Sequence, residues 1–286
     1  MLKTFNYKGI AEGSHILLTA RIHGNEPCGE IALNRLIQNI ENDSIKLHSG
    51  QLTLIPSTNP QGAQENKRFI DINMNRIFSR ELTARHHNTY EAPLCDSIMN
   101  AIDDCDYFID LHSFTEDMPP CIICIDDQNE KSKQMATVCP IKHIVCDTPF
   151  LTKEGTRMST HYAREQSKPA VLIECGQHDS PQSIETAYQS IINILNVHGM
   201  IDTNTTPSPS HEFLKITGTI HYNEGEDLIF PLMERNNINI GEPLFKTSDG
   251  QIINSTVSGT LFMRNANTPI NEEYATVYDL YDQWPQ

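Results

Sequence analysis

The sequence lacks the long hydrophobic runs and the basic excess that would assign it to several large classes of protein. No stretch approaches the roughly 18 to 20 consecutive apolar residues that a membrane-spanning helix needs, so we expect no membrane partner. The formal net charge of -16 is distributed over the whole chain, which argues against nucleic acid and anionic membranes as partners. The 286 residues suffice for one large domain, or for a large and a small one.

Cysteine is also scarce, with eight in the chain, most of them inside apolar runs. This pattern is typical of reduced core thiols rather than of a disulfide framework. The N-terminal sequence has no apolar core followed by a small-residue cleavage site, so the sequence predicts a cytoplasmic protein. Cys121 and Cys124 have CxxC spacing, but they lie in a strand-like run without a second pair, and we interpret them as structural.

Apolar patterns alternate between strand-like and helix-like along the first two thirds of the chain. Runs rich in β-branched residues predict buried strands at 15–20, 51–56, 107–111, 121–125, 143–146 and 170–175. Helical spacing predicts helices at 26–40, 94–102 and 181–197. Such alternation favours an α/β fold with a mixed, largely parallel sheet flanked by helices.

The segment 202–210, DTNTTPSPS, has two prolines and no apolar residue, and is the best linker in the chain. We therefore predict a larger first domain at 1–201, the linker at 202–210 and a second domain at 211–286. After the linker, short alternating runs broken by turn sequences predict about five to seven short strands and no long helix. The second domain is expected to be small and all-β.

The sequence HGNE at residues 23–26 follows a predicted strand and begins a predicted helix. Open α/β sheets bind ligands at this edge, and His23 and Glu26 on one turn can face the same metal ion. A hydrolytic zinc site takes three protein ligands, so a second histidine is required, and His112 at the end of another predicted strand supplies it. Strand alternation puts Asp110 on the same side, where it can accept the other ring N–H of His112. Singly, each histidine is better explained by a structural role; together they favour a metal site.

A second group of polar residues, Arg68, Asn75 and Arg76, lies in the segment 59–78. A guanidinium presents a planar fork of donors to a carboxylate and an asparagine adds an amide, so Asn75 and Arg76 can hold an anionic substrate group. Arg68 can then stabilise the negative charge that develops on a carbonyl oxygen. Taken alone, the segment is more typical of a solvated loop.

Glu174 ends a strongly apolar predicted strand, in VLIECGQHD. A carboxylate in that position is costly unless it has a partner or a chemical role. Beside a zinc-bound water it would act as general base and then as proton donor to the leaving amine, and apolar surroundings would raise its pKa toward the working range. The alternative is a strand-end carboxylate on the surface.

Short motifs occur along the chain in a fixed order: HGNE, then NP followed by R and by NR, then DLH, and finally IECG. Through these motifs the chain resembles the aspartoacylase and succinylglutamate desuccinylase family, which is related to zinc carboxypeptidases. The likeness spans roughly residues 17–177. It implies a carboxypeptidase-like α/β domain that holds one zinc ion on His23, Glu26 and His112.

The same resemblance implies roles for the remaining residues. Arg68 would polarise the scissile carbonyl, Asn75 and Arg76 would hold the substrate carboxylate, and Glu174 would be the base. Arg164, ten residues before the base, matches an arginine that binds a second carboxylate. A weaker likeness from about residue 211 implies a small β domain that caps or narrows the active-site mouth.

The chain departs from the family pattern at two places. Asn73 stands where the family has an aspartate, so one supporting carboxylate is either missing or supplied by Asp71. Asn267 or its neighbours stand where the family brings a tyrosine into the site, and Tyr274 lies too far along the chain to align. The identity of the substrate is therefore left open.

We expect a zinc-dependent deacylase that cleaves the amide bond of an N-acyl amino acid or a similar small carboxylate, and a homo-oligomer is compatible with the sequence. The first alternative is a zinc carboxypeptidase acting on short peptides. The second is a catalytically silent metal- and anion-binding protein. A serine hydrolase that uses Ser113 or Ser180 with His178 is disfavoured because the chain has no G-x-S-x-G elbow.

Overall fold

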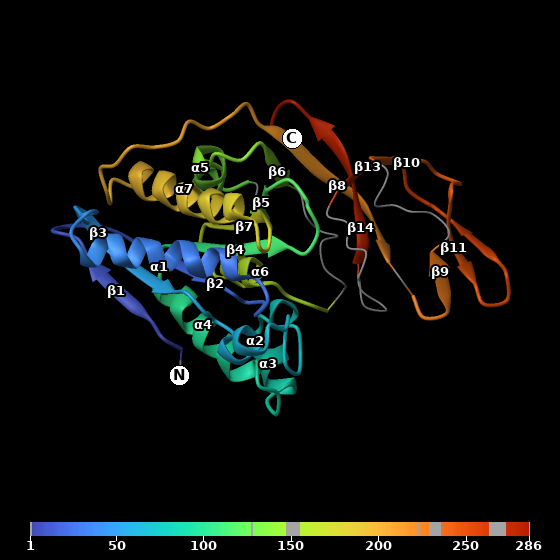
Figure 1. The fold of residues 1–286 in the computed structure, drawn as a ribbon, viewed down its shortest axis with the longest axis horizontal. Helices are drawn as coiled ribbons and strands as arrows, with labels where there is room; N and C mark the ends of the chain where they lie inside the picture. Colours follow the sequence, from blue (N-terminus) through green and yellow to red (C-terminus); the bar gives the residue numbers. More distant parts are fainter. Residues whose placement is uncertain are drawn as a thin grey trace.

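The computed structural model describes residues 2–126, 128–146, 155–221, 223–228, 236–262 and 273–285. A long sheet runs through the molecule (Figure 1). Its eleven described strands lie in the order β1 (Phe5–Lys8), β3 (Ser49–Ile55), β2 (Ala11–Ala20), β4 (Tyr107–Phe114), β7 (Ala170–Gln177), β5 (Cys121–Cys124), β6 (His143–Cys146), β8 (Glu212–His221), β14 (Glu273–Tyr281), β13 (Gly259–Phe262) and β10 (Asn237–Ile238).

The predicted mixed, largely parallel sheet is confirmed. β3, β2, β4 and β7 pair in parallel, and so do β5, β6 and β8. β1 joins the edge in antiparallel orientation, and β5 runs antiparallel to β7. All six predicted strands are present, whereas β1 was not anticipated, since FNYK is short and only half-buried.

Helices cover both faces of this sheet. α1 (Pro27–Glu41), α5 (Glu130–Val138) and α7 (Pro181–Val197) bury their apolar side chains in one core with the facing residues of the strands. α4 (Ala92–Asp104) and α6 (Ser159–Glu165) pack on the opposite face. Two further short helices, α2 (Pro60–Glu65) and α3 (Arg80–Arg85), and the 3-10 turn η1 (Met74–Arg76) follow β3. Within the described residues, none of the helices combines the length and hydrophobicity that crossing a bilayer requires.

The C-terminal strands continue the central sheet rather than standing apart from it. β8 pairs in parallel with β6, and β14, β13 and β10 follow in antiparallel order. A separate three-stranded sheet contains β9 (Glu226–Leu228), β11 (Pro243–Thr247) and β12 (Ile252–Asn254). The expected run of short C-terminal strands is therefore present, while the division into two domains at 202–210 stays a prediction.

The turn between β2 and α1 is shaped by Gly24 of the HGNE segment and by Pro27, which follows that segment. Pro27 occupies the first turn of α1, where a missing N–H costs nothing and the fixed φ favours the helix. Gly24 lies against the backbone of α2, and a Cβ added there would stand 2.1 Å from the carbonyl carbon of Gly62. Glycine thus allows the turn to approach α2 and keeps His23 at the carboxyl end of the sheet.

Candidate metal centre and substrate site

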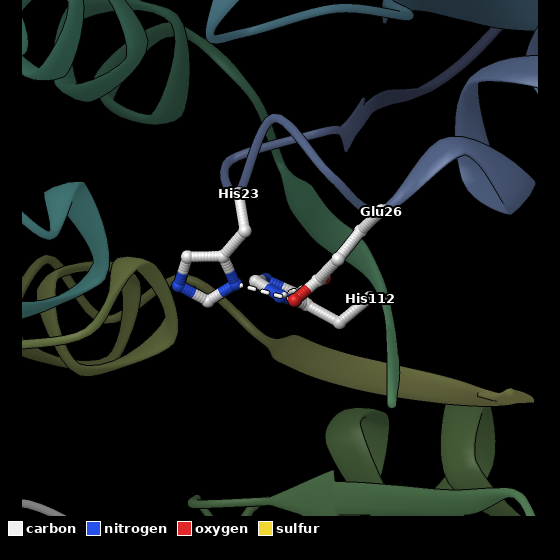
Figure 2. A group of neighbouring side chains, drawn as sticks. All are labelled: His23, Glu26 and His112. Carbon is white, nitrogen blue, oxygen red and sulfur yellow. Dashed lines mark hydrogen bonds and ion pairs between the residues drawn. The ribbon is translucent and has the colours of Figure 1, made fainter. Parts of the chain in front are cut away.

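His23, Glu26 and His112 converge on one point at the carboxyl ends of β2 and β4 (Figure 2). One ligand atom from each lies within 4.8 Å of the other two, and all three side chains are buried. Glu26 Oε1 lies 2.7 Å from His23 Nδ1, and Oε2 lies 3.0 Å from His112 Nδ1. The structure therefore brings together the three residues that the sequence nominated as metal ligands.

The amide of Asn73 determines which nitrogen of His23 can bind a metal ion. Its Oδ1 accepts the backbone N–H of Asn75 at 3.0 Å, which identifies that atom as the oxygen. His23 Nε2 lies 3.1 Å from the same oxygen and therefore carries a hydrogen. The lone pair of the neutral ring is then on Nδ1, the nitrogen that faces Glu26.

Asp110 plays the corresponding part behind His112. Asp110 Oδ2 lies 3.0 Å from His112 Nε2, while its two oxygens also accept the hydroxyls of Thr19 and Ser159. A carboxylate surrounded by donors keeps its acceptor character, so His112 Nε2 donates and Nδ1 faces Glu26. Asp110 thus lies beside the second ring nitrogen of His112, and its role in supporting a metal ligand stays a prediction.

Burial and charge oppose each other within this cluster. Burial raises the pKa of Glu26, but its close interactions with the rings of His23 and His112 hold that pKa well below its usual range. Burial lowers the pKa of His112, yet Asp110 and Glu26 raise it well above the ordinary value. Burial together with the charge of Arg68 lowers the pKa of His23 to about 4. Glu26 is thus a carboxylate and His23 is neutral, the forms in which each binds a metal.

Glu174 lies next to the cluster, because β7 pairs with β4 in a register that aligns Glu174 with His112. Glu174 Oε2 is buried and has no hydrogen-bond partner among the described residues. Burial raises the pKa of Glu174 to about 8, although the charge of His112 acts in the opposite direction. A carboxyl group with such a pKa can both accept and release a proton near neutral pH.

Arg68 reaches the same cluster from the surface. Its Nη1 donates to Glu26 Oε1 at 3.1 Å, and its side chain is 42 % exposed. Its carbonyl oxygen accepts the N–H of Gly24, which fastens this segment to the HGNE turn. A guanidinium therefore stands at the boundary between the buried ligands and solvent.

Asn75 and Arg76 lie in η1, which packs against the start of α6. Asn75 Oδ1 accepts the backbone N–H of Ser159 at 2.9 Å, so the amide nitrogen is the atom that can donate to a substrate. The backbone of Arg76 is fixed by a bond from Arg157 N at 2.9 Å. Arg164 is exposed in the last turn of α6, and it is not part of the cluster of metal ligands. Its substrate role stays a prediction.

The structure brings Ser113 and His178 together, a pair that the sequence did not favour. Ser113 Oγ lies 2.8 Å from His178 Nδ1, while Thr115 Oγ1 and Asn25 Nδ2 lie 3.2 and 3.4 Å from Nε2. In the described part of the chain no carboxylate contacts this histidine, and Ser113 is only 4 % exposed. The backbone N–H of Ser113 donates to Glu26 Oε2 at 3.1 Å, so this residue supports a metal ligand.

The geometry also shows whether Asp71 supplies the carboxylate that Asn73 lacks. Asn73 itself supports His23 with a neutral amide, whereas Asp71 accepts the backbone N–H of Tyr90 at 2.7 Å. Asp71 does not take the place of the missing aspartate in the structure. Asn267 and the side chain of Tyr274 lie outside the described residues.

Comparisons with known proteins agree with this arrangement. Residues 12–197 match the model of the family described as succinylglutamate desuccinylase/aspartoacylase catalytic domain. A probable aspartoacylase of Nostoc sp. is 26 % identical over 269 residues, which cover 87 % of this chain and 89 % of that protein. Aspartoacylase of Mus musculus is 25 % identical over 256 residues, covering 81 % of this chain and 80 % of the relative.

Among solved structures, a succinylglutamate desuccinylase/aspartoacylase from Rhodobacter sphaeroides superposes with a TM-score of 0.74 at 16 % identity, covering 98 % of this chain and 89 % of the other. That level of identity supports the fold alone. The family match extends over more than half of the chain and contains every proposed site residue. The chain therefore belongs to the succinylglutamate desuccinylase/aspartoacylase family.

Proposed function

We propose that this protein is a zinc-dependent deacylase that hydrolyses the amide bond of an N-acyl amino acid or a similar small carboxylate. The observation that carries the proposal is the buried His23, Glu26 and His112 cluster with Glu174 directly beside it. The relatives named aspartoacylase and the family match support hydrolysis of acylated amino acids as the reaction class.

The residues of the cluster suit a zinc ion. Two imidazoles and one carboxylate are a known zinc ligand set that leaves a coordination position for water or substrate. Asn73 and Asp110 hold the outer nitrogens, so Nδ1 of both rings faces the carboxylate of Glu26. A bound zinc ion would supply Lewis acidity, polarising a carbonyl oxygen and lowering the pKa of a water molecule. We expect one ion per chain.

The chain's own side chains supply the remaining chemistry. Glu174 accepts the proton of the attacking water as the new C–O bond forms, and passes it to the leaving amine nitrogen as the C–N bond breaks. Arg68 stabilises the negative charge that develops on the carbonyl oxygen. Asn75 and Arg76 hold the substrate carboxylate, with Arg164 proposed for a second one.

A carboxypeptidase acting on short peptides would use the same ligands and base. A catalytically silent binding protein would keep the cluster, but Glu174 with its raised pKa would then have no task. The cytoplasmic location and a homo-oligomer stay predictions.

The proposal is tested by measuring zinc content and turnover on N-acetyl, N-formyl and N-succinyl amino acids and on short peptides, with and without a chelator. We expect about one zinc per chain and chelator-sensitive release of an amine from an acyl amino acid. Glu174→Gln should lower kcat by roughly 10²- to 10⁴-fold and keep its zinc.

Glu130→Gln is the matched control, because this glutamate is exposed on α5 and pairs only with Lys133 among described groups. Turnover of peptides but not of acyl amino acids would favour the carboxypeptidase. A folded protein without metal and without turnover on any of these compounds would leave the deacylase assignment untenable.

A further inference from the structure

Glu91 is fully buried, yet its carboxylate binds a segment that has no regular secondary structure. Oε1 accepts the backbone N–H of Ile70 at 2.6 Å, and Oε2 accepts those of Asp71 and Ile72 at 3.2 Å each. Three consecutive amides that no helix or sheet satisfies are thus satisfied by one side chain. Because a buried carboxylate is costly without hydrogen-bond donors, these bonds satisfy Glu91 and at the same time fix the course of the segment.

The position of Glu91 in its own helix makes this bonding unusual. Glu91 precedes the first residue of α4, where a side chain ordinarily caps the helix, but its carboxylate makes no such bond. Asn59 Nδ2 lies 3.5 Å from Oε1. The partial positive charge at the start of α4 also favours the negative charge there. The neighbouring Tyr90 N–H donates back to Asp71, so the two segments hold each other.

The segment held by Glu91 carries groups on both sides of the three amides that reach the candidate site. Before them, Arg68 contacts Glu26 at 3.1 Å. After them, Asn73 contacts His23 at 3.1 Å, and Arg76 follows in η1. Displacement of the amides would therefore move both the guanidinium beside the metal ligands and the residues assigned to the substrate.

We propose that Glu91 is a positioning residue of the active site: by binding the amides of residues 70–72, it sets where Arg68 and Arg76 stand relative to the metal ligands. The roles of these two arginines rest on the proposed function, whereas the contacts made by Glu91 do not. A carboxylate is required because it offers two acceptor oxygens, while glutamine would turn its NH₂ group toward at least one N–H donor.

The experiment compares Glu91→Gln and Glu91→Asp with the natural protein and with Glu130→Gln, the exposed control described above. Amide hydrogen exchange is followed at residues 70–72 and in β2, β4 and β7, together with zinc content and steady-state kinetics. In Glu91→Gln the three amides should exchange at least about tenfold faster while the strands are unchanged. Zinc should stay near one per chain, and KM should rise about tenfold with a smaller change in kcat.

Unchanged exchange at residues 70–72 in Glu91→Gln would overturn the proposal. It is also overturned if exchange quickens equally in the strands, because the role would then be general stability. If Glu91→Gln fails to fold, Glu91→Asp is expected to show faster exchange at these three amides alone. Rapid exchange of the same amides in the natural protein would exclude the positioning role of Glu91. Hydrogen exchange can be measured without turnover. If the natural protein has no activity but Glu91→Gln still loses protection at residues 70–72, the positioning role of Glu91 is supported and the deacylase assignment is wrong.

Discussion

The two halves of the candidate site are built in different ways. The metal half, His23, Glu26 and His112, has side chains that are at most 4 % exposed and that follow or lie within strands of the sheet. The anion half consists of Arg68, Asn75 and Arg76, which lie on the irregular segment 66–73 and on η1. The side chain of Arg68 is 42 % exposed. The first half is held by the sheet, and the second by individual side-chain bonds such as those of Glu91.

This difference suits two different tasks. Metal ligands must keep their distances within a few tenths of an ångström, which strand ends and buried hydrogen bonds provide. A guanidinium on a long stem tolerates small displacements, so a segment without regular secondary structure can carry it. We therefore expect substitutions in the two halves to affect different measurable quantities.

Asp110→Asn should have the largest effect on the metal half. The substitution keeps the shape of the side chain but removes the charge behind His112, so the zinc Kd should rise about 10- to 100-fold. Competition with a chromophoric chelator measures this constant, and Asp249→Asn on the exposed β11–β12 turn is the control. An unchanged Kd would mean that the metal half does not depend on this carboxylate.

His161 reports on the charge of the anion half through pH. Burial, reinforced by Arg164, Arg157 and Arg76, lowers the pKa of His161 to about 4 from 6.5. The unfolded chain therefore binds this proton more readily, and stability falls as the pH decreases from about 6.5 toward 4. Between pH 7.5 and 5 the expected loss is about 2 kcal/mol.

Urea unfolding of the metal-free protein at these two pH values measures the loss, and His161→Gln should remove it while other groups keep their contributions. If both proteins lose equal stability on acidification, the charge assigned to this region is wrong.

Arg76→Lys is expected to raise KM about tenfold without changing zinc content, because an ammonium group cannot form the paired bonds of a guanidinium with a carboxylate. Arg85→Lys on the exposed side of α3 serves as control. Steady-state kinetics on the best substrate of the acyl amino acid panel measure both constants. A rise in zinc Kd instead would show that the two halves are not independent.

Asn73→Asp should have the smallest effect, and in the opposite direction to Asp110→Asn. A carboxylate behind His23 makes its imidazole a stronger ligand, so the zinc Kd should fall by less than about tenfold. The same chelator competition applies, and the double variant Asn73→Asp with Asp110→Asn should lie between the two single ones. Weaker binding in Asn73→Asp would contradict the neutral role assigned to this amide.

Sequence reasoning reached the metal half because its residues mark strand ends. Parallel strands bring their carboxyl ends to one edge, so the positions of His23, His112 and Glu174 follow from apolar periodicity alone. The residues that support the metal ligands were only partly predicted. Asp110 lies on the same strand as His112, but Thr19 and Ser159, which donate to Asp110, are 91 and 49 residues away from Asp110. No local pattern connects such partners.

The anion half was harder to predict for a related physical reason. Glu91 contacts amides 19 to 21 residues before it in a segment without periodicity, and a backbone N–H leaves no sign in the sequence. α6 was missed because seven residues give too few turns for helical spacing to be recognised. The contact between Ser113 and His178 likewise joins two strand ends whose side-chain directions only the fold defines.

The parallel pairing of β6 with β8 means that the C-terminal segment cannot be removed as a detachable unit. β6 is the four-residue strand HIVC, and its outer backbone groups are bonded to residues 212–215. A chain ending near residue 202 would leave this apolar strand as an open edge, where another copy can add its own strand and start aggregation. The later strands therefore cover the backbone edge that β6 would otherwise expose.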